Sequence, residues 1–233
     1  MTAQDAPITE EYAPSVVLRH LLASRHSCRA YVAQAVPRET IEAILEMAQQ
    51  TASWCNTQPW ELCVTSGSAT DRFRKELADH AASAVAAPDI PFPTEYAGKY
   101  LHRRADAARQ LYESVGADSR QAVARQVAEN FRLFGAPHLA IVTTPEMLGI
   151  YGAVDCGAYV GAFMLAARSM GVACIAQASL AAHSPFIRRF FSIPKDRWIL
   201  CGLSFGYEER SHPANTFRTT RASTEAAVTW FDD

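Results

Sequence analysis

The stretch Ser53-Trp54-Cys55-Asn56-Thr57-Gln58-Pro59-Trp60 places two carboxamides, two hydroxyls and two tryptophans between a predicted helix and a predicted strand. A simple helix-to-strand connection does not need this set of side chains. Asn56 and Gln58 can each donate and accept hydrogen bonds, which suits a flat heterocycle whose edge alternates carbonyl and N–H groups. Pro59 stiffens the exit and favours an extended backbone at Gln58. The stretch therefore predicts a ligand-binding loop.

Helical and strand-like patterns alternate along the rest of the chain. Apolar residues at helical spacing predict a first helix that ends near Arg25 and a second that Val36-Pro37 opens. Ser68 with Asp71 three residues later indicates a capped helix start. The other expected helices are 68–84, 95–115, 118–133, 151–170 and 184–191, and the expected strands are 61–65, 138–144, 172–176 and 198–205. This alternation predicts an α+β or α/β layered domain.

Composition limits the class of protein. The 233 residues are 49% hydrophobic and 20% charged, which fits one domain over 1–233, with a loose N-terminal arm at 1–13 and an extended C-terminal arm at 207–233. The net charge of -2 argues against nucleic acid and anionic membrane as partners. The polar N-terminus lacks a secretory signal, and the longest apolar run, 158–167, is too short to span a bilayer.

Cysteine and histidine usage indicates a reduced protein without a metal site. The six cysteines include no CxxC pair, and the seven histidines are scattered without an HxxxH or HExxH pattern. We therefore expect a cytoplasmic location and no bound metal.

Three motifs in order resemble the nitroreductase family of FMN enzymes. Residues 56–60 resemble its Asn-x-Gln-Pro-Trp signature, and Arg25-His26-Ser27-Cys28-Arg29 resembles its first FMN motif. Residues 201–207 and 215–221 resemble its last motif, and together with Val228-Thr229-Trp230 look closest to the nitrobenzoate reductase branch. The resemblance spans roughly residues 15 to 231. It implies an α+β three-layer fold with a central mixed sheet flanked by helices, and a homodimer with two FMN sites at the subunit interface.

The resemblance also implies roles for the cationic motif residues. Arg25, Arg218 and Arg221 would hold the FMN phosphate with Ser27, because a guanidinium makes paired, charge-assisted hydrogen bonds to phosphate oxygens. His26 belongs to the same cofactor motif. Arg29 would lie at the N1 and C2-carbonyl edge of the flavin, where a fixed cation stabilises the negative charge gained on reduction.

The remaining site residues would surround the flavin ring. Asn56 would bind the pyrimidine edge with Gln58 as a second contact, and Ser53 and Trp54 would contact the flavin, with Ser53 coming from the same or the opposite subunit. Main-chain groups of Gln177, Ala178 and Ser179 would approach flavin N5 and the C4 carbonyl. Trp54, Phe92 and Tyr96 are candidate substrate contacts.

Two longer segments are also candidates for a functional role. The segment 88–96 is either a mobile lid or a surface connector. The apolar helix 151–170 is a candidate dimer interface.

The expected activity is NAD(P)H-driven reduction of nitroaromatic compounds to hydroxylamines or amines by a ping-pong mechanism. Two alternatives stay open: reduction of enones, quinones or flavin or reductive dehalogenation on the same scaffold, and a protein that stores or senses FMN without turnover. Gly202-Leu203-Ser204-Phe205-Gly206 also matches the nucleophile elbow of serine hydrolases, but no helical stripe follows it. We therefore do not expect a hydrolase.

Overall fold

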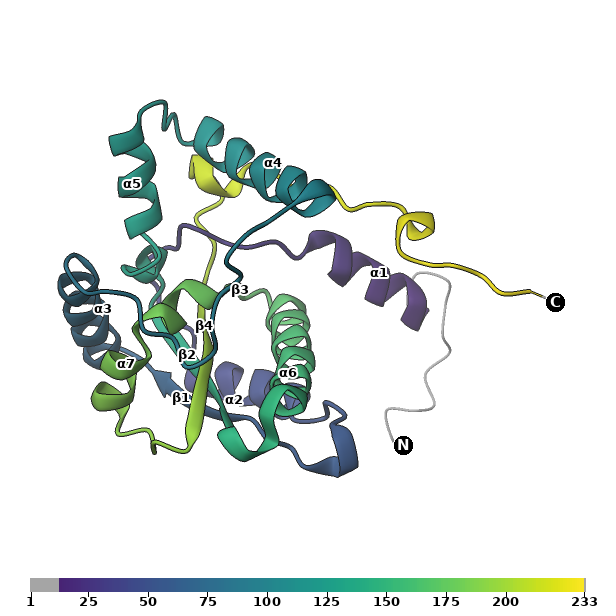
Figure 1. Cartoon of the computed structure of the whole chain (residues 1–233), viewed down its shortest axis with the longest axis horizontal. Helices are drawn as coiled ribbons and strands as arrows, with labels where there is room; N and C mark the ends of the chain where they lie inside the picture. The colour runs from purple at the N-terminus through teal and green to yellow at the C-terminus, as the bar shows by residue number, and fades with distance from the viewer. Residues whose placement is uncertain (1–12, 233) are drawn as a thin grey trace.

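The computed structural model describes residues 13–232, and its centre is a four-stranded sheet (Figure 1). The strand order is β1-β2-β4-β3, and the strands are β1 (Glu61–Thr65), β2 (His138–Pro145), β3 (Ala173–Gln177) and β4 (Arg197–Gly206). All three pairings are antiparallel, so the expectation of a mixed sheet is wrong for these strands. The parallel component within residues 13–232 is one isolated bridge, Ser27–Cys174, because the segment before Cys28 runs beside β3 for a single residue pair.

The helices occur where the sequence predicts them, with shifts of a few residues at their ends. They are α1 (Pro14–Ser24), α2 (Arg38–Ala48), α3 (Ser68–Ala81), α4 (Gly98–Ser114), α5 (Arg120–Ala128), α6 (Gly149–Ser169) and α7 (Ser184–Phe191). Short 3-10 turns lie at Trp54–Asn56, Leu133–Gly135, Glu146–Leu148, Ala178–His183, Pro213–Asn215 and Thr224–Ala226.

Two helix boundaries differ from the prediction for local reasons. Ser68 is the first helical residue of α3 and not its cap: Gly67 holds the cap position, and no side chain caps the end. The predicted helix 118–133 ends at Ala128, because from Asn130 on the main-chain N–H groups donate three residues back and no longer four: Asn130 N donates to the Val127 carbonyl at 3.1 Å and Phe131 N to the Ala128 carbonyl at 3.0 Å. Further along, the buried residues Leu133 and Phe134 take left-handed backbone angles, with φ of 58° and 52°.

The sheet separates two apolar cores, which gives the expected three layers of an α+β domain. On β2, Leu139 and Ile141 join a core with α3 and α7, whereas Ala140 and Val142 join a core with α2 and α6. Alternate residues of a strand point to opposite faces, so β2 supplies both cores. Figure 1 shows α3 and α7 at one side of the sheet and α2 and α6 at the other.

Helix α6 has one face in the core and another at the surface. Six of its residues are buried, including Tyr159 and Phe163, while Ile150, Tyr151 and Val154 are exposed. By length and composition alone, the stretch Glu146–Ser169 is long and apolar enough to cross a membrane. A third of the residues in its most apolar part are buried inside the protein. The stretch is longer than the apolar run on which we based the expectation of no membrane span. The apolar residues on the buried face of α6 pack against the sheet and α2.

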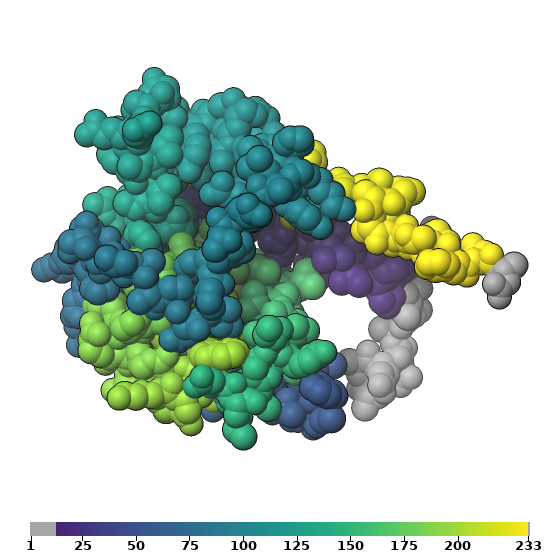
Figure 2. Space-filling view, in the orientation of Figure 1, coloured from purple at the N-terminus to yellow at the C-terminus, as the bar shows by residue number. Residues whose placement is uncertain are grey.

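Two long segments of the chain within residues 13–232 contain little helix and no strand. The segment between α3 and α4 is held to the domain by Asp89, whose Oδ2 accepts hydrogen bonds from Arg188 Nη2 and from Ile199 N, both at 2.7 Å. Residues 207–232 form two short 3-10 turns and otherwise irregular chain, and they run past α4 and α1 away from the body (Figure 2). The N-terminal arm predicted at 1–13 lies outside the described residues except for Ala13.

Candidate functional site

Four arginines converge on one cavity of about 470 Å³. Its walls come from the turn after α1, from Ala107 of α4 and from the C-terminal segment. The lining residues that matter for chemistry are Arg25, His26, Ser27, Arg29, Phe217, Arg218, Thr219 and Arg221. We call this the arginine cavity. It unites every residue that the sequence assigned to a phosphate site, although the two contributing segments are nearly two hundred residues apart.

The guanidinium groups in this cavity pair with no carboxylate of the described residues. Among residues 13–232, none of Arg25, Arg29, Arg218 and Arg221 forms an ion pair. Arg218 Nη1 donates to the carbonyl of Asn215 at 2.6 Å, and Arg221 Nη1 donates to Thr219 Oγ1 at 2.9 Å. A guanidinium has five N–H donors, so most remain for a ligand. The donor set therefore fits a doubly charged phosphate.

Arg29 lies between the arginine cavity and a second cavity. It lines both, and its Nη1 donates to the carbonyl of Ser27 at 3.3 Å. Burial lowers the pKa of Arg29, and its guanidinium lies 5.8 Å from the centre of the Phe217 ring. A partly buried cation without a carboxylate partner favours an electron-rich ligand.

The second cavity, of about 270 Å³, contains the residues after β3. Gln177, Ala178 and Ser179 line it with Arg29 and Asn130. The buried Gln177 side chain is engaged elsewhere: its Nε2 donates to the Asn130 carbonyl at 2.9 Å, and its Oε1 accepts from Ser204 Oγ at 2.5 Å. Main-chain groups are therefore what this edge offers a ligand, as the resemblance implied. Sequence reasoning missed Asn130, which no local pattern distinguishes.

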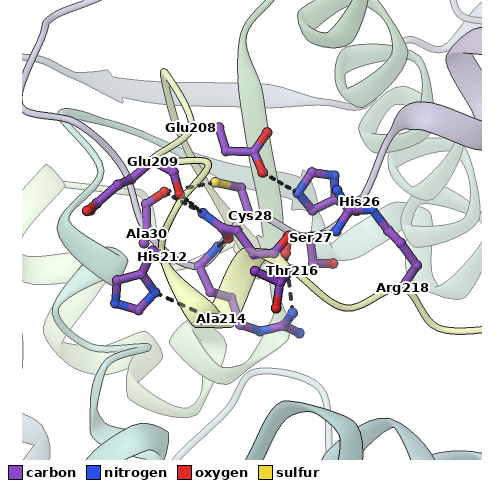
Figure 3. A network of polar contacts seen from close by, with 12 residues as sticks. His26, Ser27, Cys28, Ala30, Glu208, Glu209, His212, Ala214, Thr216 and Arg218 are labelled. Carbon is purple, nitrogen blue, oxygen red and sulfur yellow. Dashed lines mark hydrogen bonds and ion pairs between the residues drawn. The ribbon is translucent and has the colours of Figure 1, made fainter. Parts of the chain in front are cut away.

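The turn that carries Arg25 to Arg29 is fixed by partners distant in sequence (Figure 3). Arg29 N donates to Asn215 Oδ1 at 2.7 Å, and Asn215 Nδ2 donates to the carbonyls of Ala30 and Glu209 at 2.9 and 3.0 Å. Cys28 N donates to the Cys174 carbonyl at 3.2 Å. Asn215 thereby joins the first motif to the last.

His26 is paired with Glu208, a residue that sequence reasoning did not select. Its Nε2 lies 2.9 Å from Glu208 Oε1, and the two side chains are 12% and 13% exposed. Burial lowers the pKa of His26, Glu208 opposes that change, and Arg218 adds to it. Glu208 follows a strand in a polar stretch, which carries no signal of this pairing.

The loop 53–60 is compact and strained. Cys55, Asn56 and Gln58 have φ values of 50°, 57° and 45°, a region that residues with a Cβ seldom occupy. The expectation that Pro59 holds Gln58 in an extended conformation is therefore wrong. Ser53 Oγ accepts a hydrogen bond from Gln58 N at 2.9 Å and so closes the loop. The buried Trp60 anchors its exit. Within residues 13–232 the Asn56 carboxamide has no hydrogen-bond partner, so a ligand can use it.

This loop lies far from the arginine cavity of the same chain. Trp54 N donates to Asp155 Oδ2 at 3.1 Å near the start of α6, whereas Arg168 near its end donates to Ser24 Oγ at 2.9 Å. At about 1.5 Å of rise per residue, the two contacts are roughly 20 Å apart along the helix. One chain does not bring Ser53, Trp54, Asn56 and Gln58 to the cavity that holds the arginines.

The candidate substrate residues are exposed and do not line either cavity. Trp54 packs against the Tyr151 ring with centroids 4.9 Å apart and stays 63% exposed. Phe92 and Tyr96 are 40% and 43% exposed, and the Arg104 guanidinium lies 5.0 Å from the Tyr96 ring.

The structure also settles the alternative motif around Ser204. This serine is fully buried in β4, its hydroxyl donates to Gln177, and no helix follows Gly206 within the described residues. A nucleophile elbow needs an exposed serine between a strand and a helix. The Gly-x-Ser-x-Gly match at 202–206 is therefore not a nucleophile elbow.

Comparison with known proteins agrees with these motifs. Residues 22–207 match the model of the Nitroreductase family. The chain is 33% identical to nitroreductase NfnB of Mycolicibacterium smegmatis, over 87% of each chain, and 33% identical to 4-nitrobenzoate reductase of Nocardioides sp., over 95% of this chain and 98% of that one. It superposes on the structure of FMN-dependent nitroreductase NfnB from Mycobacterium smegmatis in complex with NADPH with a TM-score of 0.90 and 30% identity, over 94% of this chain and 100% of that one. The chain therefore belongs to the nitroreductase family.

Proposed function

We propose that the protein is an FMN-dependent oxidoreductase that uses NAD(P)H to reduce nitroaromatic compounds. The observation that carries this proposal is the arginine cavity, which lies beside a second cavity lined by Arg29 and residues 177–179. Its four guanidiniums form no ion pair within the part of the chain that the structure describes. The names of the relatives, which include FMN, NADPH and 4-nitrobenzoate, support the same conclusion.

The residues of the two cavities fit FMN. Arg25, Arg218 and Arg221 would hold the phosphate with the Ser27 hydroxyl, because this donor set matches a phosphate dianion. Arg29, which lines both cavities, would lie at the ring edge that gains negative charge. When bound, FMN supplies the two-electron chemistry, and the protein contributes binding, orientation and electrostatics.

We propose that the active form is a homodimer with the cofactor sites at the subunit interface. Asn56 and its neighbours are roughly 20 Å along α6 from the arginine end of their own chain, as estimated from the helical rise. The outer face of α6 exposes Ile150, Tyr151 and Val154 next to that loop. A second copy that covers this face would bring its own loop to the flavin of the first chain. Ser53, Trp54, Asn56 and Gln58 would then act across the interface.

The reaction would follow a ping-pong order. The nicotinamide would stack on the exposed ring face and leave before the nitroaromatic acceptor enters the same place. Trp54, Phe92 and Tyr96 would cover the acceptor, which would be reduced in two-electron steps to a hydroxylamine or an amine. We expect the protein to act in the cytoplasm.

Two further readings of the same site remain as alternatives. The scaffold could act on enones, quinones, flavins or halogenated aromatics, since the cavities described here do not encode the acceptor. A flavin-binding protein without turnover would share the arginine cavity but would show no reduction by NAD(P)H.

The visible spectrum of the purified protein tests the proposal. We expect a bound flavin that NADPH or NADH bleaches without oxygen, and whose colour returns on addition of a nitroarene. A matched addition of an enone distinguishes the acceptor class. A protein that is colourless and does not bind added FMN would contradict the proposal, and a bound flavin that no nicotinamide bleaches would favour the storage alternative.

A further inference from the structure

We propose that Glu208 positions His26 as a protonated partner of the anion in the arginine cavity, so that binding of the anion draws one proton onto the imidazole. The anion is taken to be the FMN phosphate, and in that respect the inference rests on the proposed function. It goes beyond that function by assigning a role to Glu208 and by coupling cofactor affinity to pH.

The hydrogen-bond geometry of His26 offers an acceptor to each of its ring nitrogens. Nε2 lies 2.9 Å from Glu208 Oε1, and Nδ1 lies 3.4 Å from the Ser24 carbonyl oxygen. An ionised carboxylate and a carbonyl only accept hydrogen bonds, so both contacts need an N–H on the imidazole. Only the doubly protonated, cationic ring satisfies both partners at once.

Burial of the ring opposes that cation as long as no anion is present. The ring is partly withdrawn from water, and Arg218 is close enough to lower its pKa, whereas Glu208 raises it. The thiols of Cys28 and Cys174 on the neighbouring turn and strand are neutral, because burial raises their pKa values to about 11 and about 12. His26 lines the arginine cavity and also a small hollow that Arg168 and Cys174 line, and the other cations of these two hollows are Arg25, Arg29, Arg168 and Arg221.

An anion in the cavity reverses this balance. His26 and Arg218 line the same hollow, as Figure 3 shows from close by, so a phosphate there lies near both. Its negative charge offsets the effect of burial and the repulsion from Arg218, and so favours the imidazolium. The pKa of His26 is then higher in the complex than in the free protein. At a pH between those two values, binding of the phosphate adds a proton to His26. The affinity for FMN then falls as pH rises, by at most about tenfold per pH unit.

Glu209 provides a matched control for the proposed role of Glu208. Glu209 lies next to it on the chain and lines a different hollow, and among residues 13–232 its carboxylate forms no ion pair. Glu208→Gln removes the charge that supports the imidazolium, while Glu209→Gln removes the same charge one residue away. His26→Asn removes the titrating ring, and riboflavin provides a flavin without the phosphate.

The experiment is FMN titration by calorimetry in buffers of different ionisation enthalpy, which gives the number of protons taken up on binding. The titrations run from about pH 7 to about pH 8.5. Free FMN is already mostly the dianion in this range, because its second phosphate pKa is about 6. We expect the wild-type protein and Glu209→Gln to take up the same fraction of a proton, His26→Asn to take up none, and Glu208→Gln to take up less. Riboflavin should bind without proton uptake.

The outcomes separate this inference from the proposed function. FMN that does not bind at all contradicts the function. FMN that binds with equal proton uptake in the wild-type protein and in His26→Asn overturns the coupling and leaves the function intact. If His26→Asn does not fold, Glu208→Gln decides: proton uptake equal to that of Glu209→Gln would overturn the role of Glu208.

Discussion

The backbone N–H of Arg29 donates a 2.7 Å hydrogen bond to the side-chain oxygen of Asn215, which joins the first cofactor motif to the last. The same carboxamide donates to the carbonyls of Ala30 and Glu209, and Asn215 is 2% exposed. The position of the Arg29 guanidinium between the two cavities therefore depends on a residue that contacts neither cavity.

Asn215→Ala should destabilise the fold and loosen the cofactor. The substitution leaves the Arg29 N–H without its partner, while the carbonyls of Ala30 and Glu209 keep the N–H groups of Glu209 and His212, so the free energy of unfolding should fall by about 1 to 3 kcal/mol. Urea unfolding measures this change. Thr216→Ala is the matched control, because that exposed hydroxyl bonds only within its own turn. Equal stability of the two variants would contradict the bridging role of Asn215.

Arg29→Ala should lower the midpoint potential of the bound flavin. A cation beside the reduced ring stabilises its negative charge, and its loss should cost about 30 to 60 mV, since 30 mV is about 1.4 kcal/mol for two electrons. Spectroelectrochemistry on the flavin-loaded protein gives the potential. Arg125→Ala, an exposed arginine on α5, should leave it unchanged. The same potential in wild-type protein and Arg29→Ala would place Arg29 away from the ring.

Arg221→Ala should weaken FMN retention. A lost charge-assisted hydrogen bond to phosphate is worth about 1.5 to 3 kcal/mol, roughly a tenfold to 150-fold rise in Kd. FMN content after gel filtration, followed by titration, measures the loss. Arg38→Ala serves as the comparison, because Arg38 pairs with Glu42 on the surface of α2. Full FMN content in the Arg221 variant would remove it from the phosphate site.

Mixing of subunits should show whether the loop 53–60 acts across a dimer interface. Arg221→Ala and Asn56→Ala subunits, each with its own tag, are expressed together and the mixed dimer is purified. If the loop serves the opposite chain, one of the two sites contains no substitution and should regain wild-type turnover. If both residues serve one site within a chain, every site carries a substitution, and turnover should stay at the level of the single variants.

Stability should fall as pH drops below about 6.5, the ordinary histidine pKa. Burial lowers the pKa of His138, whose Nε2 accepts a hydrogen bond from Val36 N at 2.9 Å and must be unprotonated to do so. A lowered pKa in the folded state means that the unfolded state binds more protons in this range, so stability is complete above it and lost as pH decreases.

Urea unfolding between about pH 8 and pH 5 tests this dependence, with a slope of at most ~1.4 kcal/mol per pH unit for each histidine. His138→Asn should flatten the curve without abolishing it, since burial also lowers the pKa values of His26 and His183. His20→Asn, an exposed histidine of α1, should keep the wild-type slope. An unchanged slope in His138→Asn would assign the dependence to other groups.

Much of the fold follows from local pattern. The spacing of apolar residues located β1 and α7 to the residue, because periodicity and turn residues act over a few positions. Pattern misplaced the end of α5, because after Ala128 the main-chain hydrogen bonds run three residues back, a change that the apolar spacing does not indicate. It also gave no register, and the sheet is antiparallel where the family resemblance implied a mixed one.

By itself, the sequence determined that cationic and amide motifs occur in the order of a flavin site, because motif residues can be matched one position at a time. Only the tertiary structure decided which of them meet. It brought Arg25 and Arg29 to Arg218 and Arg221, and kept the loop with Asn56 at the other end of α6. It also supplied Glu208 for His26, 182 positions away, and Asn215 for Arg29, 186 positions away. Contacts of that separation depend on sheet pairing and on packing of the helices, which no local pattern specifies.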